Sequence, residues 1–277
     1  MEPTQTQPNE QPIEDVNASA GRYFHQHDLK YLYLAAVVEL ALVEAVIFYD
    51  WSPYLLILPI FGIIVVYGRE RDQIEQKFFE QEAQAFGMSY SPTGDLRTVT
   101  GKLFKAGHSQ SIRHVLTGSM NGRATRIFQF SFTIGYGKSS RTIVSTVFET
   151  VFNNDMPDII LRGTKSVFGL IEIALGEEKV TLEGDFNAYF SLRVPKGFEA
   201  DAYEILTPDI MADLIDKAKD ISFEFCGNRL YIYTNGAEMN RTKLQQAIDF
   251  AGYLENLFSR SSQAVDVASE QPQPAAG

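Results

Sequence analysis

Apolar and polar positions divide the chain into five stretches. Residues 1–30 and 261–277 are rich in small and polar side chains, so we expect disordered tails at both ends. Residues 31–68 are almost continuously apolar, and residues 69–86 place apolar side chains at helical spacing, which predicts a juxtamembrane helix. Over residues 87–260 the apolar period shifts in many places to two, which is typical of half-buried strands.

The apolar stretch at 31–68 predicts a transmembrane helical hairpin. Its first run, residues 31–49, would span about 28 Å as a helix, close to a hydrocarbon core of about 30 Å. A shorter run follows at 54–67, and Pro53 separates the two. Tyrosines and Trp51 cluster at the ends of both runs, as in an interfacial aromatic belt. The alternative is a buried helical hairpin in the core of a soluble protein.

Basic side chains flank this hairpin on one side only. Arg22 and Lys30 precede it, Arg69 and Arg71 follow it, and the connecting turn holds neither Lys nor Arg. The positive-inside rule then places both termini and the domain at 87–260 in the cytoplasm, anchored to the cell inner (plasma) membrane. The lipid bilayer is thereby an expected partner. A single cysteine in the chain agrees with a reducing compartment.

Glu39 and Glu44 stand out within the first apolar run. An ionised carboxylate at the centre of a bilayer costs on the order of 2.5–3.5 kcal/mol, so we expect both to face protein or to be protonated. Five residues along a helix is a rotation of about 140°, so one narrow stripe cannot hold both. They are therefore candidate intramembrane binding contacts, for a membrane-protein partner or for a proton. The alternative is a hairpin that self-associates and hides both.

The domain at 87–260 predicts a mostly antiparallel sheet. Asn121-Gly122 separates two alternating runs, and this dipeptide is typical of a tight β-hairpin. Gly227-Asn228 marks a second hairpin, and a short helix is expected at 96–106. The expected strands cover residues 112–120, 123–134, 141–152, 157–162, 179–184, 188–194, 221–226 and 229–234.

Two helices complete this domain. Thr207-Pro208-Asp209 combines a capping hydroxyl, a first-turn proline and an acid that favours a helix N-terminus. The last helix starts at Asn240, and its sustained apolar stripe should lie across the sheet. The fold class is α+β: a two-helix transmembrane hairpin followed by a mostly antiparallel β-sheet domain with helices packed on it, including a long C-terminal amphipathic helix.

Charge adds two constraints. The net charge of −11 argues against a nucleic-acid binder, so no nucleic-acid partner is expected. Residues 87–166 carry 10 basic and 4 acidic side chains, whereas residues 167–260 carry 9 and 16. This split is either an ordinary solvated surface or, for the basic half, a face towards anionic lipid headgroups.

No residue pattern indicates catalysis. Gly137-Lys138-Ser139 ends like a phosphate-binding loop, but Phe132 stands where that loop needs a glycine, so a hairpin turn is the better interpretation. His108 and His114 lie near serines without the context of a catalytic triad. Cys226 has no histidine nearby and is interpreted as structural. We expect no metal site, cofactor or catalytic residue.

Short motifs across residues 103–258 resemble a family of uncharacterised bacterial membrane-anchored proteins carrying a cytoplasmic domain of unknown function. These motifs are the run from Ile112 to Gly118, Arg126-Ile127-Phe128, the run from Gly135 to Thr142, the run from Met156 to Leu161, Gly184-Asp185-Phe186, Tyr189-Phe190 and Ile205-Leu206-Thr207. The resemblance implies an anchored cytoplasmic domain and transfers no mechanism.

Three functions remain open from the sequence. The first is an uncharacterised membrane-anchored protein that acts as a non-catalytic cytoplasmic binding or scaffold module. The second is a membrane-bound enzyme of unrecognised class. The third is an accessory subunit of a transport or secretion assembly that uses Glu39 in the bilayer.

Overall fold

The structure is a computed structural model that describes residues 12–49, 54, 58–153, 155–169, 178–182, 184–197 and 199–269. The chain divides into two compact units. The first unit holds Met1–Glu82 with Met239–Thr242, and the second holds Ala83–Glu238 with Lys243–Gly277.

Two helices make up most of the first unit, α1 (Val16–Tyr49) and α2 (Leu58–Ala85), of which the last three residues belong to the second unit. Helix α1 starts upstream of the predicted start at residue 31, because Asp15 caps it: its Oδ1 accepts from the Ala18 N–H at 2.9 Å. Asp15 Oδ2 also accepts from Asn240 Nδ2 at 2.9 Å, which ties the start of α1 to residues 239–242.

The predicted membrane-spanning hairpin at 31–68 is wrong. Within the residues that the structure describes, no helix combines the length and the apolar character that crossing a membrane requires. Helix α1 carries Glu39 and Glu44 in its apolar part, and α2 passes into charged sequence at Arg69. The apolar start of α2, residues 58–68, is about 16 Å long at the helical rise, roughly half of a hydrocarbon core. The connection with Trp51 and Pro53 lies outside the described residues.

The second unit is built on a single antiparallel sheet. Its nine described strands lie in the order β1-β2-β3-β4-β9-β8-β5-β7-β6, and every neighbouring pair is antiparallel. The strands are β1 (Ser89–Gly94), β2 (His108–Met120), β3 (Arg123–Ile134), β4 (Arg141–Val151), β5 (Ile159–Gly163), β6 (Glu178–Val180), β7 (Phe190–Val194), β8 (Ser222–Cys226) and β9 (Arg229–Tyr233).

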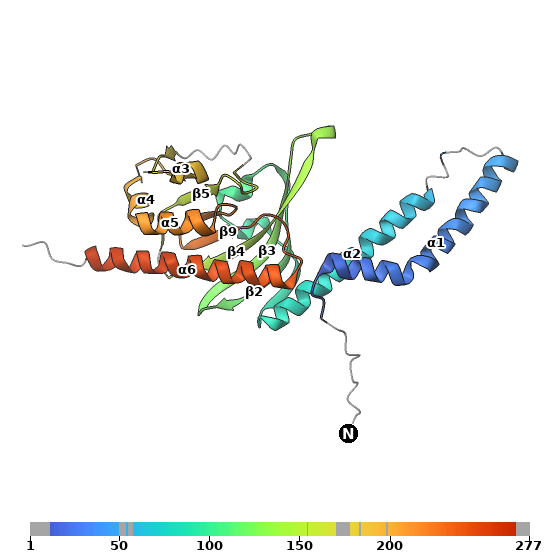
Figure 1. The fold of residues 1–277 in the computed structure, drawn as a ribbon, viewed down its shortest axis with the longest axis horizontal. Helices are drawn as coiled ribbons and strands as arrows, with labels where there is room; N and C mark the ends of the chain where they lie inside the picture. The colour runs from blue at the N-terminus through green and yellow to red at the C-terminus, as the bar shows by residue number, and fades with distance from the viewer. Residues whose placement is uncertain are drawn as a thin grey trace, which may run out of the picture. The chain divides into compact units, whose positions relative to one another are not determined.

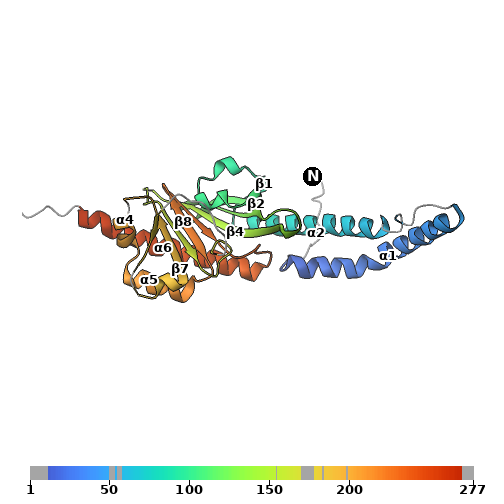
Figure 2. The same cartoon turned by 90° about the horizontal axis from the view of Figure 1, so that it is seen from above.

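Short helices and one long helix accompany the sheet. The 3-10 turns are η2 (Leu96–Thr98), η3 (Lys102–Lys105) and η4 (Gly137–Ser139), and the α-helices are α3 (Phe186–Tyr189), α4 (Glu199–Ile205), α5 (Pro208–Lys217) and α6 (Arg241–Ser269). Figures 1 and 2 show α6 running across one face of the sheet. Phe258 of α6 packs there against Phe223 and Phe225 of β8, with ring centroids 5.1 and 5.0 Å apart.

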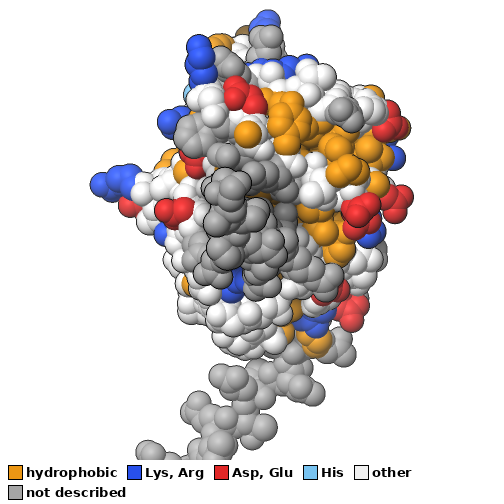
Figure 3. All heavy atoms as spheres, turned by 90° about the vertical axis from the view of Figure 1, so that its left-hand side faces the viewer, with side chains coloured by type: hydrophobic (Ala, Val, Ile, Leu, Met, Phe, Trp, Pro, Cys, Tyr) orange, Lys and Arg blue, Asp and Glu red, His pale blue; other side chains and the backbone are white. Residues whose placement is uncertain are grey.

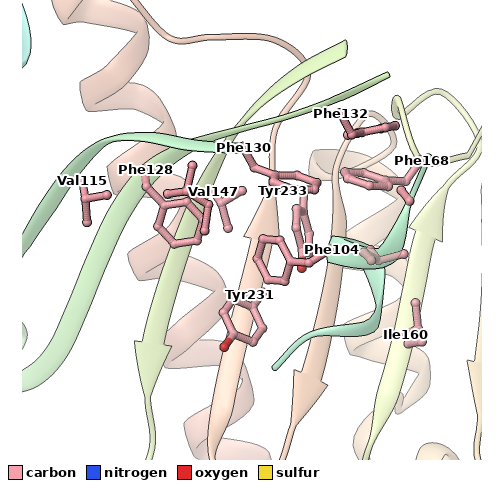
Figure 4. Packing of buried hydrophobic residues seen from close by; sticks show 13 residues of the cluster. Phe104, Val115, Phe128, Phe130, Phe132, Val147, Ile160, Phe168, Tyr231 and Tyr233 are labelled. Atoms are coloured by element: carbon pink, nitrogen blue, oxygen red, sulfur yellow. The ribbon is translucent and has the colours of Figure 1, made fainter. Parts of the chain in front are cut away.

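The opposite face of the sheet is covered by residues 95–107, which we call the strap. Leu103, Phe104 and Ala106 of the strap enter an apolar cluster with side chains of β2, β3, β4, β5 and β9. The Phe104 ring lies 4.9 Å from that of Phe130 and 5.1 Å from that of Tyr231, both in edge-on contact, and Figure 4 shows these rings together. Side chains alternate along a strand, so each central strand contributes to both buried faces.

Several local predictions from the sequence are confirmed only in part. The strands expected from the sequence are present, but β6 covers only the start of the range expected at 179–184, and residues 188–189 belong to α3 and not to β7. The helix expected at 96–106 is instead the two 3-10 turns η2 and η3. Asn121 and Gly122 form the β2–β3 turn with positive φ angles of 51° and 78°. The sequence did not predict strand β1, because this strand contains Pro92. A proline is tolerated in an edge strand, and β1 lies at the edge of the sheet. Thr207 makes no capping side-chain hydrogen bond to α5, although a proline occupies the first turn as expected. Helix α6 continues to Ser269, beyond the predicted end near residue 260.

We predict that Phe258→Ala lowers the free energy of unfolding of the second unit by about 3–5 kcal/mol, because it leaves a cavity between α6 and β8. The matched control is Asn256→Ala on the exposed side of α6, which should change it by less than about 0.5 kcal/mol. Urea denaturation of both variants measures the difference. Equal stability of the two variants would show that α6 does not cover this face of the sheet.

Candidate functional site

A row of polar side chains crosses the strap face of the sheet. The strand register places Thr117 of β2 opposite Arg126 of β3, and Arg126 opposite Glu149 of β4. Glu149 is opposite Tyr231 of β9, which is in turn opposite Glu224 of β8. Five adjacent strands therefore bring two acids, an arginine, a tyrosine and a threonine into one line, although these residues are spread over more than a hundred positions of the sequence.

An open groove lies at the β2–β3–β4 end of this row, with a volume of about 290 Å³. We call it the groove; it is lined by Thr98, Thr117, Gly118, Ala124, Thr125, Arg126, Glu149, Val151 and Arg229. Three of these side chains are charged, and they carry two positive charges and one negative charge. The groove thus has one net positive charge.

Glu149 is the buried centre of the groove, with only 1 % of its side chain exposed. Its Oε2 accepts from Arg126 Nε at 2.5 Å, and its Oε1 accepts from Arg229 Nη1. The Tyr231 hydroxyl donates to the same Oε1 at 3.3 Å. Donors from three residues compensate the burial of this carboxylate, as a buried ion pair requires.

The two arginines differ in what remains available to a ligand. Arg126 also donates to Thr98 of the strap, through Nη1 to Oγ1 at 2.9 Å and through Nη2 to the carbonyl oxygen at 3.3 Å. Arg229 directs one nitrogen at Glu149 and is 34 % exposed, and a guanidinium holds five N–H donors. Burial acts to lower the pKa of Arg229, but its hydrogen bond to and charge interaction with Glu149 prevail and raise it. Arg229 therefore presents spare, permanently charged donors to the groove.

Glu224 lies at the other end of the row, beneath the strap, and is 1 % exposed. Its Oε2 accepts from the Lys102 N–H at 2.7 Å, and its Oε1 accepts from the Leu103 N–H at 3.2 Å and from the Tyr233 hydroxyl. Burial raises the pKa of Glu224 to about 7, although these hydrogen bonds act to lower it. A Cβ on Gly101 would collide with this carboxylate, so glycine is needed where the strap passes over it.

Tyr231 connects the two ends of the row. Its hydroxyl accepts from the Thr100 N–H at 3.3 Å while it donates to Glu149. Burial raises the pKa of Tyr231, and burial together with the charge of Glu224 raises that of Tyr233 well above its usual range. Both tyrosines are therefore neutral hydrogen-bond donors at physiological pH.

The candidate residues from the sequence lie elsewhere. Glu39 and Glu44 are both on α1, the first half-buried and the second exposed, and no hydrogen bond or ion pair of either is found in the described part of the chain. Their role as binding contacts stays a prediction. Leu40 and Ile47 of the same helix are 67 % and 68 % exposed, and large exposed apolar areas mark interaction surfaces. Self-association through these helices also stays a prediction.

The remaining candidates are accounted for by local structure. Gly137-Lys138-Ser139 forms η4 in the β3–β4 connection, as the hairpin-turn interpretation expected. His108 stacks on Tyr136 with centroids 4.7 Å apart, and its Nε2 bonds the Gly135 carbonyl at 2.9 Å. Cys226 donates a weak hydrogen bond to the Thr100 carbonyl at 3.5 Å. On the face of the molecule shown in Figure 3, charged side chains of both signs are scattered and hydrophobic ones gather in one area, so surface charge alone does not identify a site there.

Comparisons with known proteins add one finding. No protein-family model and no curated protein matches this chain, so the resemblance seen in the sequence stays a prediction. One solved structure, the mycobacterial trehalose monomycolate transport factor A (TtfA), is similar at 14 % identity with a TM-score of 0.49, covering 66 % of this chain and 93 % of that one. A similarity at this level supports no inference about what the present chain does.

We predict that stability falls as pH rises through the titration of Glu224. The folded pKa of about 7 lies above the unfolded value of 4.5, so the folded state holds the proton more tightly. The stabilising contribution is complete below about pH 4.5 and is lost by about pH 7, on the order of 3 kcal/mol. Urea denaturation of the wild type and Glu224→Gln from pH 4.5 to 8 measures it. A difference between the two proteins that does not change with pH would contradict the prediction.

Proposed function

We propose that the second unit is a non-catalytic binding module that holds a ligand through a small anionic group, a carboxylate or a phosphate, in the groove. The observation that carries this proposal is the pair Arg126 and Arg229 at the floor of an open groove with one net positive charge. Guanidinium groups bind both anion classes with directed N–H bonds, which gives orientation as well as attraction.

The internal partner of the arginines supports a binding role. Glu149 holds both guanidinium groups in place through opposite oxygens, so their positions are set before a ligand arrives. Preorganised donors lose little conformational entropy on binding. The volume of about 290 Å³ is at the lower end for ligand sites, which suits one anionic group and a short attachment rather than a large cofactor.

The same arrangement favours binding over acid–base chemistry. The Glu149 oxygens already accept hydrogen bonds from Arg126, Arg229 and Tyr231, so this carboxylate is placed to orient cations and not to take a proton from a ligand. The titratable acid with a shifted pKa, Glu224, is bonded to the strap backbone, away from the residues that line the groove.

We predict that Arg229→Gln weakens anion binding by the full chain about tenfold or more, because it removes charge-assisted donors from the groove while Arg126 keeps Glu149 paired. Isothermal titration with sulfate, inorganic phosphate and acetate measures the affinities. Sulfate and acetate separate a preference for a tetrahedral anion from a preference for a carboxylate.

The matched control is Arg141→Gln, which removes the same charge from the exposed far end of β4. It should leave the affinities unchanged. An equal loss in both variants would mean that the anions respond to overall charge and not to the groove. Absence of binding of all three anions to the wild type would refute the proposal.

A further inference from the structure

The strap is fastened to the sheet at three polar points in succession. Thr98 accepts from Arg126 in the groove, Thr100 bonds the Tyr231 hydroxyl, and the Lys102 and Leu103 amides bond Glu224. Thr98 is also a wall of the groove. One short segment therefore holds both Thr98, which lines the groove, and the Lys102 and Leu103 amides, which bind the buried Glu224 carboxylate.

Other titratable and charged groups face Glu224 from each neighbouring element. The strap contributes Lys102, whose charge lowers the pKa of Glu224, and β9 contributes Tyr231 and Tyr233. Glu149 of β4 is beyond Tyr231 in the same row, and Cys226 is two residues along β8 on the same face.

The remaining neighbours of Glu224 are on β5 and β7. Ile160 of β5 lies opposite it, Arg162 is one row further along β5, and Arg193 of β7 is beyond Ile160. The hydrogen bonds to the Glu224 carboxylate come from the strap backbone and from Tyr233, so strap position and Glu224 ionisation are directly connected.

We propose that the strap is a proton-coupled latch on the groove: it closes with uptake of a proton by Glu224 and opens with loss of that proton. This inference rests on the proposed binding function and adds its regulation. Opening brings water to the carboxylate, which removes the cost of burying its charge. It also releases Arg126 Nη1 and Nη2 from Thr98, which adds donors to the groove.

The direction of the coupling follows from linkage. In the closed strap the pKa of Glu224 is about 7, and in an open, solvated state it returns towards 4.5. Closure therefore takes up a proton between these values and becomes weaker as pH rises. From pH 5.5 to 8 the fraction of open strap is expected to rise on the order of tenfold. Anion binding in the groove should strengthen over the same range.

Cys226 is the only cysteine in the chain, and it is half-buried with its Sγ against the Thr100 carbonyl of the strap, so opening of the strap exposes it further. Alkylation by N-ethylmaleimide is followed by mass spectrometry from pH 5.5 to 8 in the wild type and in Glu224→Gln. Thiolate formation accelerates the reaction with pH in both proteins, so the ratio of the two rates isolates the latch. The ratio should rise with pH, by at most about tenfold because the half-buried thiol also reacts while the strap is closed.

A second variant serves if Glu224→Gln folds poorly. Tyr233→Phe keeps the carboxylate and removes a hydrogen bond that lowers its pKa, so the transition in the Cys226 rate should move to higher pH. Sulfate affinity of the full chain is measured at pH 6 and pH 8 in parallel, because the charge of sulfate is the same at both.

The outcomes separate the latch from the binding function. A pH-independent ratio, or an unmoved transition in Tyr233→Phe, overturns the latch whether or not sulfate binds. A rising ratio with sulfate affinity that increases from pH 6 to 8 supports both. A rising ratio with constant sulfate affinity overturns the control of the groove, and a rising ratio with no sulfate binding at either pH overturns the proposed function alone.

Discussion

Two carboxylates buried on the same face of one sheet are the constraint from which the rest of the site follows. A buried acid must be hydrogen-bonded or it destabilises the fold, and a sheet offers no free backbone donors on its faces. Glu149 obtains its donors from arginines on β3 and β9, whereas Glu224 obtains backbone donors from the strap. The strap thus has to cross the sheet where it does, and Gly101 is required at the crossing because a side chain would occupy the carboxylate position.

Glu149 and Glu224 are both buried acids, but the donors that bind them differ in charge. Guanidinium groups surround Glu149, and their hydrogen bonds to it fix the geometry of the groove. Neutral donors surround Glu224, which leaves the cost of burying its charge largely uncompensated and raises its pKa to about 7. Tyr231 lies between them, and its hydroxyl bonds both Thr100 of the strap and Glu149. The Arg126–Glu149–Arg229 network and the contact between Glu224 and the strap therefore belong to one row of side chains.

Local sequence patterns predicted the strands and the last helix well, because turn chemistry and apolar period act over a few residues. Asn121-Gly122 and the apolar stripe of α6 are examples. The site was not predictable in this way. Glu149 pairs with an arginine 80 residues later, and Glu224 with amides more than 100 residues earlier. A local pattern contains only the nearby partner of Glu224, Tyr233 in the same hairpin. A polar residue at an inward position of an alternating strand was the available indication, and both acids occupy such positions.

Hydropathy misled the interpretation of residues 31–68 for a related reason. An apolar run indicates removal from water but does not identify the environment, and Glu39 and Glu44 already conflicted with a bilayer. The same logic applies in reverse to the groove. Its arginines are the kind of residue that a surface-charge argument would assign to solvent, yet the carboxylate of Glu149 draws both inward and orders them. A net charge of −11 for the whole chain is therefore compatible with a local anion site. The charges within a few ångströms of the groove, and not the net charge of the chain, determine which ligands the groove attracts.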